Sequence, residues 1–414
     1  MDNQQTAKRK WPFCRHLWPK SASSADCGKR DRTDNSTAFV RQISRGLKIS
    51  ATHEIFRNSR KLGQFLKNIN AWISSQDFRK TLLAWSASLD TKNPKHTASR
   101  AIACMAAGHW GEAHSLWRKP FSASITGEQQ QLWNAGRIIT QWILDPETLV
   151  EATSQKYLAA DTSPEETVVS SAITSNHDLS WPAGELLHST HYIRFTDDPS
   201  ISTWNIWQNR PLEYLADSPV RSARWVKTHP HMLFPDSRWV IWLDGNIIPV
   251  QGLQSLLAEF QASGHPMAAI PHPSRTRVDE EIAACIRRGK DDPETIKQHH
   301  TMLGEDPLVG LWETGVCFFD LDHPQLKPLL TTWWSHIESG SHRDQISLPY
   351  AVKATDSTIH PLLPPGHSTR SDQRFALIPH GEAAFRKAHT QLKTATQLAS
   401  LKSPTEFAIV GRTK

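Results

Sequence analysis

The spacing of hydrophobic residues divides the chain of 414 residues into segments with different expected structures. Between residues 46 and about 145, apolar side chains recur every three or four positions, as Ile55, Leu62 and Leu66 do, which predicts amphipathic helices. After about residue 166, short apolar runs alternate with helical patterns instead. We therefore expect an all-α segment followed by an α/β segment.

The pattern of the α/β segment predicts a series of buried strands separated by helices. The predicted strands are 168–174, 191–196, 204–208, 239–243, 267–270 and 316–319. The predicted helices are 219–233, 251–263, 277–289, 293–303, 324–339 and 343–354. Alternation of this kind is typical of βαβ units, so we predict a Rossmann-type, mostly parallel sheet flanked by helices. Ligands bind such sheets at the carboxyl ends of the strands, and polar residues just past each strand are therefore the candidates for chemistry.

Composition and pattern together predict four segments. We expect a disordered basic tail over 1–45, an α-helical domain over 46–160, an α/β domain over 161–385 and a C-terminal helix or tail over 386–414. Within the helical domain, 101–117 places small residues, a turn at Gly108 and then Trp110, Ala113 and Trp117 in an order typical of a tetratricopeptide-type helical pair. A single such unit favours a small helical domain over a peptide-binding array.

The formal charge of +6 arises in the basic tail, which holds ten of the 47 basic and four of the 41 acidic residues. The remainder is balanced, which argues against a nucleic-acid-binding groove. Aromatic and basic residues interleave over 10–20; a solvated tail is the preferred interpretation, and peripheral contact with an anionic membrane is the alternative. The sequence contains neither a signal-peptide pattern nor a membrane-spanning run, and its five cysteines form no C-x-x-C pair, so we expect a cytoplasmic protein.

The first candidate site follows the apolar run 239–243, which ends in Asp244, Gly245 and Asn246. Oxygen ligands in this position can hold a divalent cation, although Asp-Gly-Asn is equally a turn sequence. The second candidate is the helix that carries Arg221, Arg224 and Lys227 at intervals of three, near one helical face. Cations aimed in the same direction suit a diphosphate, and a solvated basic face is the alternative.

Two further candidates also lie beside predicted strands or helix starts. Glu313 precedes the strand at 316–319, and Arg343, Asp344 and Gln345 enter a helix together, which is more polar hydrogen bonding than a helix cap requires. His272 and Arg275 follow the strand at 267–270, where a loop histidine without a special role is the plain alternative.

In their order along the chain, these elements resemble a glycosyltransferase-like family first described as domain of unknown function 616. Its members include plant mucilage and pectin proteins and bacterial polysaccharide-cluster proteins. The resemblance covers roughly 167–355. It rests on these elements: Val168–Ile173, Phe195–Asp198, the helix with Arg221, Arg224 and Lys227 followed by His231–Pro235, Ile241–Gly245, His272 and Arg275 with Glu280 and Glu281, Glu313–Gly315, and Arg343–Ser347.

The resemblance implies a GT-A-like fold and a nucleotide-sugar donor. It implies that Asp244 is the retained acid of the Asp-x-Asp site of such enzymes, with Asn246 in place of the second acid. Dependence on Mn²⁺ or Mg²⁺ is therefore open, and Arg221, Arg224 and Lys227 would share the diphosphate charge. Of three late histidines, His360, His367 and His380, we favour His367 as a metal ligand.

The resemblance assigns the remaining residues as follows. Asp344 would lie nearest the anomeric carbon, Glu313 would hold the acceptor or a sugar hydroxyl, and Arg343 would accompany them. Asp197 and Asp198 would reach the ribose or base. The other donor-binding residues would be Gly245, His272, Arg275 and Gln345.

The function expected from the sequence is therefore transfer of a hexose or hexuronic acid from a nucleoside-diphosphate sugar to a glycan or a glycolipid-linked acceptor. The alternative is a non-catalytic glycan-binding, nucleotide-binding or scaffold protein built on a degenerate transferase domain, which the replacement of an acid by Asn246 supports. Retaining and inverting mechanisms both remain open.

Overall fold

The computed structural model describes residues 83, 87, 94–119, 127–150, 167–187, 190–380 and 383–402. It divides into two compact units, which we describe separately. One comprises Met1–Asp145 with Gly381–Ala395, and the other comprises Pro146–His380 with Thr396–Lys414. The predicted disordered tail and the helical pattern around Ile55 lie outside the described residues.

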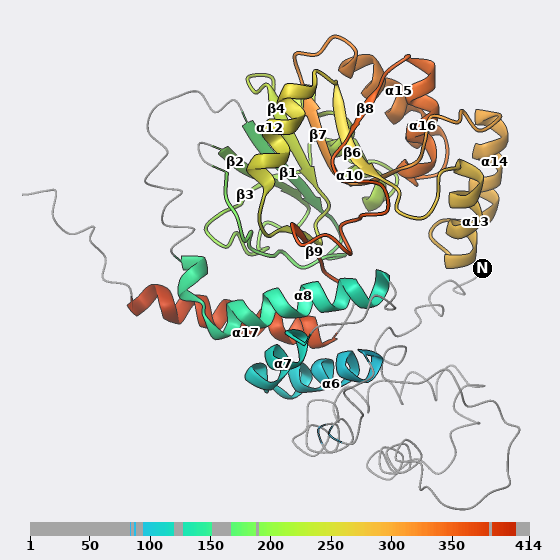
Figure 1. Cartoon of the computed structure of the whole chain (residues 1–414). Coiled ribbons are helices and arrows are strands. Elements are labelled where there is room, and N and C mark those ends of the chain that lie inside the picture. Colours follow the sequence, from blue (N-terminus) through green and yellow to red (C-terminus); the bar gives the residue numbers. More distant parts are fainter. Residues whose placement is uncertain are drawn as a thin grey trace, which may run out of the picture. The chain divides into compact units, whose positions relative to one another are not determined.

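The first unit is helical (Figure 1). Its described helices are α6 (Pro94–Ala107), α7 (Trp110–Trp117), α8 (Gly127–Leu144) and the first part of α17 (Ala383–Lys402). Gly108 makes the turn between α6 and α7 with φ +88, a left-handed conformation that favours glycine. Gly136 of α8 lets Trp117 approach so closely that any Cβ at residue 136 would lie 2.3 Å from its indole. The tetratricopeptide-like character of this unit stays a prediction.

The second unit contains a seven-stranded sheet, as the α/β pattern predicted. Its strands are β1 (Thr167–Ile173), β2 (Thr190–Thr196), β3 (Gln208–Pro211), β4 (Trp239–Leu243), β6 (Met267–Pro271), β7 (Trp312–Asp320) and β8 (Ile359–Pro361). The order across the sheet is β3-β2-β1-β4-β7-β6-β8. A separate two-stranded sheet pairs β5 (Ile247–Pro249) with β9 (Phe375–Leu377). The fold is α/β with a mostly parallel main sheet, which confirms the predicted fold class.

The strands β3, β2, β1 and β4 run parallel, whereas β7 runs antiparallel to both β4 and β6. The pairing of β7 with β6 is irregular: Ala269 lies opposite Cys317, but the next residue, Ile270, lies opposite Glu313. Thr314, Gly315 and Val316 thus form a bulge, which re-aims polar groups at the end of the sheet.

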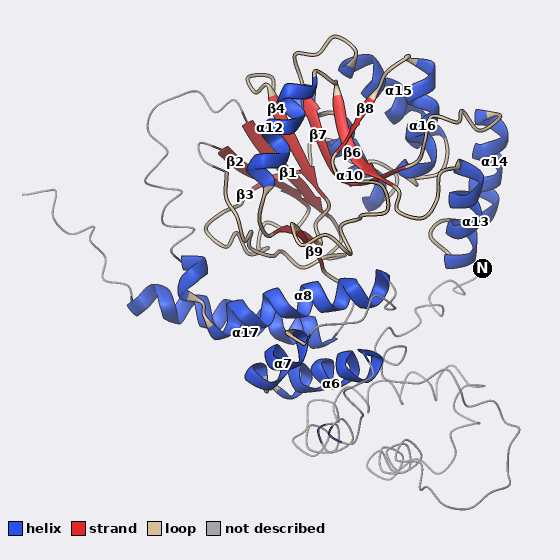
Figure 2. Cartoon of the chain, viewed as in Figure 1, coloured by secondary structure: helices blue, strands red, loops and turns tan. Residues whose placement is uncertain are grey.

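Helices cover both faces of this sheet (Figures 1 and 2). The helices on the sheet are α10 (Pro219–Thr228), α11 (Pro230–Leu233), α12 (Leu253–Ser263), α15 (Leu326–Ser339) and α16 (Asp344–Ala354). Two more, α13 (Val278–Arg288) and α14 (Pro293–Leu303), pack with α16 in a separate cluster. Successive residues of a strand point to opposite faces of the sheet and pack into two separate hydrophobic cores. Val240 and Trp242 of β4 pack with α10, α15 and α16, whereas Ile241 and Leu243 pack with α12.

Two predicted elements are wrong. The strand predicted over 204–208 is a turn in which Trp204 and Asn205 have positive φ, and the edge strand begins only at Gln208. The apolar Trp-x-x-Trp spacing there reflects burial of Trp207 beneath β2 rather than a strand. The helix predicted over 219–233 is divided at His229, because Pro230 cannot continue the hydrogen bonding of α10.

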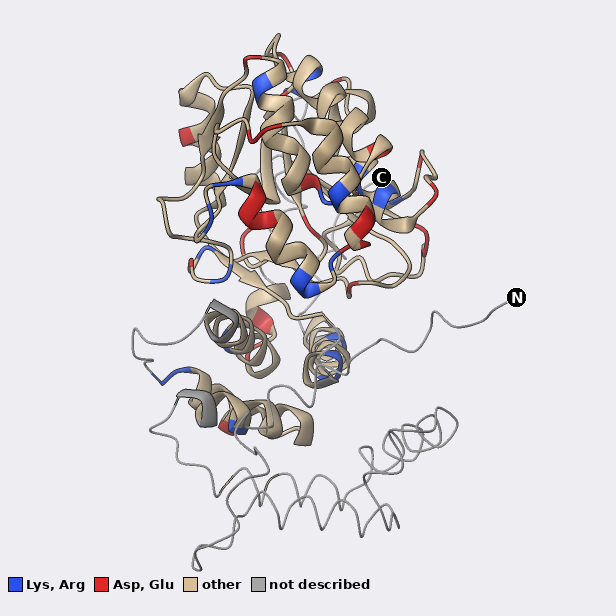
Figure 3. Cartoon of the chain, turned by 90° about the vertical axis from the view of Figure 1, so that its right-hand side faces the viewer, with Lys and Arg blue, Asp and Glu red and all other residues tan. Residues whose placement is uncertain are grey.

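Acidic and basic positions are interspersed over the described helices and loops of the α/β unit (Figure 3). This distribution agrees with the charge balance of the sequence after residue 45. Within the described part of the chain, none of the helices combines the length and the apolar composition needed to span a bilayer.

Candidate active site

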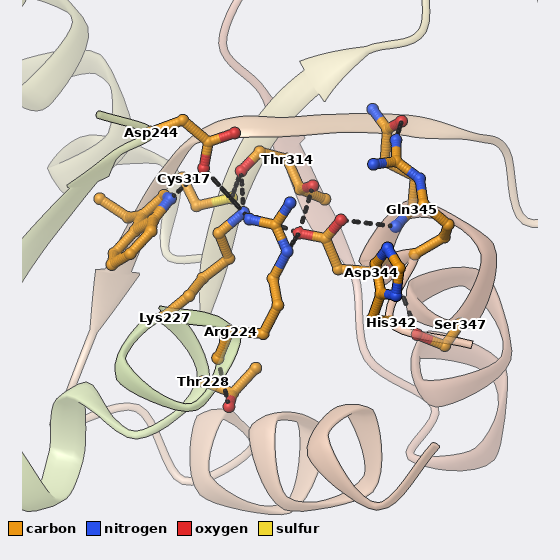
Figure 4. Close-up of polar contacts among 12 residues, drawn as sticks. Arg224, Lys227, Thr228, Asp244, Thr314, Cys317, His342, Asp344, Gln345 and Ser347 are labelled. Carbon is orange, nitrogen blue, oxygen red and sulfur yellow. Dashed lines mark hydrogen bonds and ion pairs between the residues drawn. The ribbon is translucent and has the colours of Figure 1, made fainter. Parts of the chain in front are cut away.

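Two acids and two bases meet at the carboxyl end of β4 (Figure 4). Arg224 and Lys227 reach from α10, Asp244 follows the last residue of β4, and Asp344 is the first residue of α16. We call these four residues the ion cluster. The clustering of Asp244, Arg224 and Lys227, which lie up to 20 residues apart in sequence, agrees with the expected position of polar side chains just past a strand.

The distances within the ion cluster are those of direct ion pairs. Lys227 Nζ lies 2.7 Å from Asp344 Oδ2 and 3.1 Å from Asp244 Oδ1. Arg224 lies 3.2 Å from Asp344 through Nε and 3.4 Å from Asp244 through Nη1. The side chains of Lys227 and Asp344 are buried, whereas that of Asp244 is 30% exposed. Asp244 is thus the acid of the cluster that a ligand can reach.

Local sequence explains how α10 presents its two cations. Ser218 caps the helix by accepting a hydrogen bond from the Arg221 amide, and Pro219 occupies the first turn, where no amide donor is needed. Three residues correspond to about 300° of helical rotation, so Arg224 and Lys227 lie about 60° apart around the axis and point the same way.

Arg221, by the same geometry, lies about 120° from Lys227 and points elsewhere. Its guanidinium binds the carboxylate of Asp217 at 2.6 Å and the backbone carbonyls of Ile337, at 3.2 Å, and Gly340. It thereby caps the C-terminal end of α15, where free carbonyls attract a cation. The structure therefore does not bring Arg221 together with the other two cations.

The bulge in β7 completes the surroundings of the ion cluster. Thr314 donates its hydroxyl to Asp344 Oδ2 at 2.9 Å, and its carbonyl accepts a hydrogen bond from Lys227 Nζ at 2.8 Å. Gly315 lies so close to Asp244 that a Cβ would be 3.4 Å from Oδ2 and 2.7 Å from a methyl of Ile247. The Trp242 indole donates to Asp244 Oδ1 at 2.8 Å.

The charges of the cluster stabilise one another. Burial by itself would raise the pKa of Asp344, but Arg224, Lys227 and Arg343 outweigh it and hold that pKa far below its ordinary value. Burial likewise opposes the ionisation of Asp244, and Lys227 and Arg224 again lower its pKa. Both acids are therefore ionised at neutral pH, and the cluster carries no net charge.

Glu313, on β7, has a different environment. Its Oε1 accepts a hydrogen bond from Arg370 at 2.7 Å, while its buried Oε2 accepts none from the described residues. Burial raises the pKa of Glu313, and Arg370 offsets only part of this rise. Glu313 is two residues from Gly315, which contacts Asp244, so this carboxyl lies on the strand that borders the ion cluster.

Arg343 and Gln345 flank Asp344 at the start of α16. Gln345 donates its backbone amide to Asp344 Oδ1 at 3.1 Å and accepts a 3.4 Å hydrogen bond from Arg343 through its side chain. The three polar residues predicted to act together thus form one hydrogen-bonded turn. All the polar atoms of the Asp344 carboxylate are occupied within it and by the cations.

Asp197 and Asp198 lie past the end of β2 and mainly organise loops. Asp197 accepts the backbone amide of Ser175 at 2.8 Å through Oδ2, which ties down the loop after β1. Asp198 accepts the amide and hydroxyl of Ser200, at 2.9 and 2.6 Å.

His272 and Arg275 pair with each other and with α13. Arg275 Nε donates to Glu281 at 2.7 Å, and His272 Nδ1 accepts the Arg275 amide at 3.0 Å. Burial lowers the pKa of His272 to about 4, so its ring is neutral at pH 7. These contacts hold the loop after β6 and leave the two side chains engaged with protein groups.

The residues predicted to hold a metal ion do not fit one at Asp244. Its carboxylate already faces Lys227 and Arg224, which would repel a divalent cation. The amide nitrogen of Asn246 donates to the carbonyl of Ile378 at 2.8 Å. His367 is 53% exposed and neighbours Asp372, and the ring of His360 lies tilted against that of His265. It is His380 that reaches the strand-end turn, 3.2 Å from Asn246.

The sequence analysis assigned no role to several residues that the structure brings to this edge of the sheet. Thr314 and Arg370 contact Asp344 and Glu313, and His177 and Asp178 lie in the loop after β1, beside His380. The rule that polar residues past a strand are candidates would have found His177 and Asp178. Nothing in the sequence signals Arg370, because it reaches Glu313 from 57 positions away.

Comparison with known proteins gives one family. Residues 185–361 match the family model "TOD1/MUCI70, glycosyltransferase-like domain". No curated protein matches the chain. Among solved structures, the apo structure of WbbM, described as a bifunctional glycosyltransferase, aligns with a TM-score of 0.30 and 9% identity over 48% of this chain. The chain spans 40% of that protein's length.

The matched segment includes α10, β4, β7 and the start of α16, and hence all four residues of the ion cluster. The family resemblance seen in the sequence is thereby confirmed for this segment: residues 185–361 match the model of the TOD1/MUCI70 glycosyltransferase-like domain.

Proposed function

We propose that the protein transfers a hexose or hexuronic acid from a nucleoside-diphosphate sugar to a glycan or lipid-linked acceptor. The observation that carries this proposal is the ion cluster: two cations on one helix, held beside a partly exposed acid at the carboxyl ends of the strands. This is where α/β sheets bind ligands, and paired cations suit a diphosphate. The glycosyltransferase-like family match supports the same class of reaction.

The two acids of the cluster have different parts in this proposal. Asp344 is buried and accepts hydrogen bonds from Lys227, Thr314 and the Gln345 amide, so it acts as a fixed counter-ion that positions Lys227 and Arg224. A carboxylate with a strongly lowered pKa is a poor proton acceptor. Asp244 is partly exposed, and a diphosphate can compete with it for Arg224.

Glu313 is the better candidate to interact with the acceptor hydroxyl. It has an oxygen without a hydrogen bond from the described residues, and burial raises its pKa above the ordinary value of a glutamate. A carboxylate of this kind can accept the proton that leaves the attacking hydroxyl as the new glycosidic bond forms. Arg370, bound to the other oxygen, holds the carboxylate in place.

A second group of cations supports an anionic ligand in the same region. Burial lowers the pKa of Lys290, and the positive charges of Arg343, Arg288 and Arg370 lower it further, so Lys290 lies close enough to these three arginines to be repelled by them. A nucleoside diphosphate, or the carboxylate of a uronic acid, would relieve that repulsion.

The experiment uses the full chain, isothermal titration calorimetry with UDP and GDP, and a panel of UDP- and GDP-sugars assayed for hydrolysis and transfer. We expect Arg224→Met to weaken nucleotide binding at least tenfold. Glu313→Gln should leave nucleotide binding intact and lower turnover at least a hundredfold. Lys353→Met, an exposed residue of α16, is the matched control and should leave both unchanged.

Two results would contradict the proposal in different ways. Nucleotide binding without hydrolysis or transfer of any donor would favour the non-catalytic alternative. Failure of the wild type to bind either nucleotide, or binding that Arg224→Met does not weaken, would remove the ion cluster as the donor site.

A further inference from the structure

A group of potential metal ligands lies at the same edge of the sheet, outside the ion cluster. His177 and Asp178 belong to the loop after β1, and His380 follows β9. One ligand atom from each lies within 4.8 Å of the others, and no other such group occurs among the described residues. His380 Nδ1 lies 2.6 Å from Asp178 Oδ1, and the two imidazole rings are 4.7 Å apart.

The surrounding structure holds all three residues in place. The carboxylate of Asp197 binds the Ser175 amide, which fixes the loop that carries His177 and Asp178. Asp178 Oδ2 lies 3.3 Å from the position that a Cβ on Gly245 would occupy, so the loop packs against the turn after β4. Asn246 of that turn binds both the Ile378 carbonyl and the His380 ring.

A structural Asp-His hydrogen bond is the simplest explanation of the contact between Asp178 and His380. The amide nitrogen of Asn246 can only donate, so His380 Nε2 accepts, and Nδ1 then carries the proton that Asp178 accepts. That explanation does not require His177. The imidazole of His177, an exposed residue, lies beside the ring of His380. This second imidazole is the feature that points to a ligand.

We propose that His177, Asp178 and His380 bind a divalent transition-metal ion. Two nitrogen ligands and one carboxylate leave coordination positions open, and imidazole favours transition metals such as Mn²⁺ and Zn²⁺ over Mg²⁺ and Ca²⁺. Binding at His380 Nδ1 would release the proton that this nitrogen shares with Asp178, because a metal ligand must be deprotonated. Metal–ligand bonds of about 2.1 Å place ligand atoms roughly 3–4 Å apart, so the three ligand atoms, now within 4.8 Å of one another, would also move closer together.

The position explains why the Asp244 turn does not need to hold the metal itself. The ion cluster is neutral, so a bound diphosphate requires further positive charge. A divalent ion held by His177, Asp178 and His380, beside Gly245 and outside the ion cluster, would supply that charge. This role of the ion rests on the proposed function, whereas ion binding itself does not.

The test measures metal binding without any nucleotide sugar. The full chain is stripped with a chelator, dialysed and titrated with MnCl₂ and, separately, ZnCl₂ in a calorimeter. We expect one site per chain for at least one of the two metals. His177→Ala and Asp178→Asn should each weaken binding at least tenfold, whereas His367→Ala, which removes an exposed histidine elsewhere in the same unit, should not.

Four results would overturn the proposal. They are the absence of a stoichiometric site for both metals, full affinity in His177→Ala, full affinity in Asp178→Asn, and an equal loss in His367→Ala. Full affinity in His177→Ala would leave only the Asp-His hydrogen bond. If a variant fails to fold, X-ray absorption spectroscopy of the zinc-loaded wild type decides instead. We expect two imidazole ligands to the zinc ion, and fewer than two would overturn the proposal.

The outcomes for the metal and for the donor are separable. Metal binding by the three residues in a chain that binds no nucleotide would refute the proposed function and retain the metal site. If the chain binds nucleotide, loses that binding in Arg224→Met and binds no metal, the proposed function would stand and the metal site would be refuted. If both proposals hold, saturating Mn²⁺ or Zn²⁺ should tighten UDP binding at least tenfold in the wild type and not in Asp178→Asn.

Discussion

Replacing Lys227 by methionine should destabilise the α/β unit strongly. The ammonium is buried, 2.7 Å from Asp344 and 3.1 Å from Asp244. With an effective dielectric constant of about 20, the closer pair alone interacts by roughly 6 kcal/mol, part of which offsets the cost of removing the ammonium from water. Removing one partner of such a pair costs about 3–5 kcal/mol, because the remaining charge stays buried.

The measurement is scanning calorimetry of the full chain, which can follow the melting of the α/β unit separately from that of the helical unit. For a unit of this size, a loss of about 3–5 kcal/mol lowers Tm by roughly 6–20 °C. Methionine keeps the unbranched side chain of lysine as far as Cε and lacks only the ammonium group, so the loss reports mainly the charge rather than a cavity.

A double variant distinguishes the buried charge from other causes. Lys227→Met/Asp344→Asn removes the carboxylate that the single variant leaves uncompensated, and it should recover at least half of the lost Tm. Lys353→Met is the control and should change Tm by less than about 2 °C. The reasoning is refuted if the single variant loses under about 1 kcal/mol, or if the double variant is no more stable than the single.

Three more predictions follow from the same structure. Folding lowers the pKa of Asp344, so the stabilisation from its carboxylate is complete well above pH 4 and is lost as the pH falls below that value. Between pH 7 and pH 2.5, the Tm of Asp344→Asn should therefore fall less steeply than that of the wild type. Asp236→Asn, which changes an exposed residue, is the control. Gly315→Ala should lower the free energy of unfolding by about 1–3 kcal/mol and weaken UDP binding, because the new Cβ would lie 2.7 Å from Ile247 and press on Asp244. Gly111→Ala, whose Cβ would meet nothing within 4 Å, should be neutral or stabilising in the same melting assay. Burial raises the pKa of Cys104 to about 12 and that of Cys285 to about 11. After iodoacetamide treatment of the folded protein at pH 8, mass spectrometry should therefore find both thiols unlabelled. Labelling of either cysteine before unfolding would contradict its burial.

The ion cluster shows where local sequence is sufficient. Arg224 and Lys227 are three residues apart on a helix with a clear N-cap, and Asp244 directly follows an apolar run. Helix periodicity and the termination of a strand are local properties, so the sequence can place these groups at one edge of a sheet. The order of the motifs was also enough to indicate the glycosyltransferase-like family.

Arg221 and His367 show where local sequence fails. Arg221 shares the spacing of the other two cations, but the carbonyls at the end of α15, more than 100 positions later, bind its guanidinium. The sequence offered three late histidines of similar appearance, and the path of the chain around β9 decided that His380 reaches the turn after β4.

The sequence by itself determined the alternation of strands and helices, the two faces of β4 and the acid at its end, because burial and helix periodicity act between near neighbours. Only the tertiary structure decided the antiparallel course of β7, the bulge that turns Thr314 towards Asp344, and the meeting of His177 and Asp178 with His380. Those arrangements depend on contacts between residues 30 to about 200 positions apart. Such contacts exist only after the whole sheet has formed, and no local pattern encodes them.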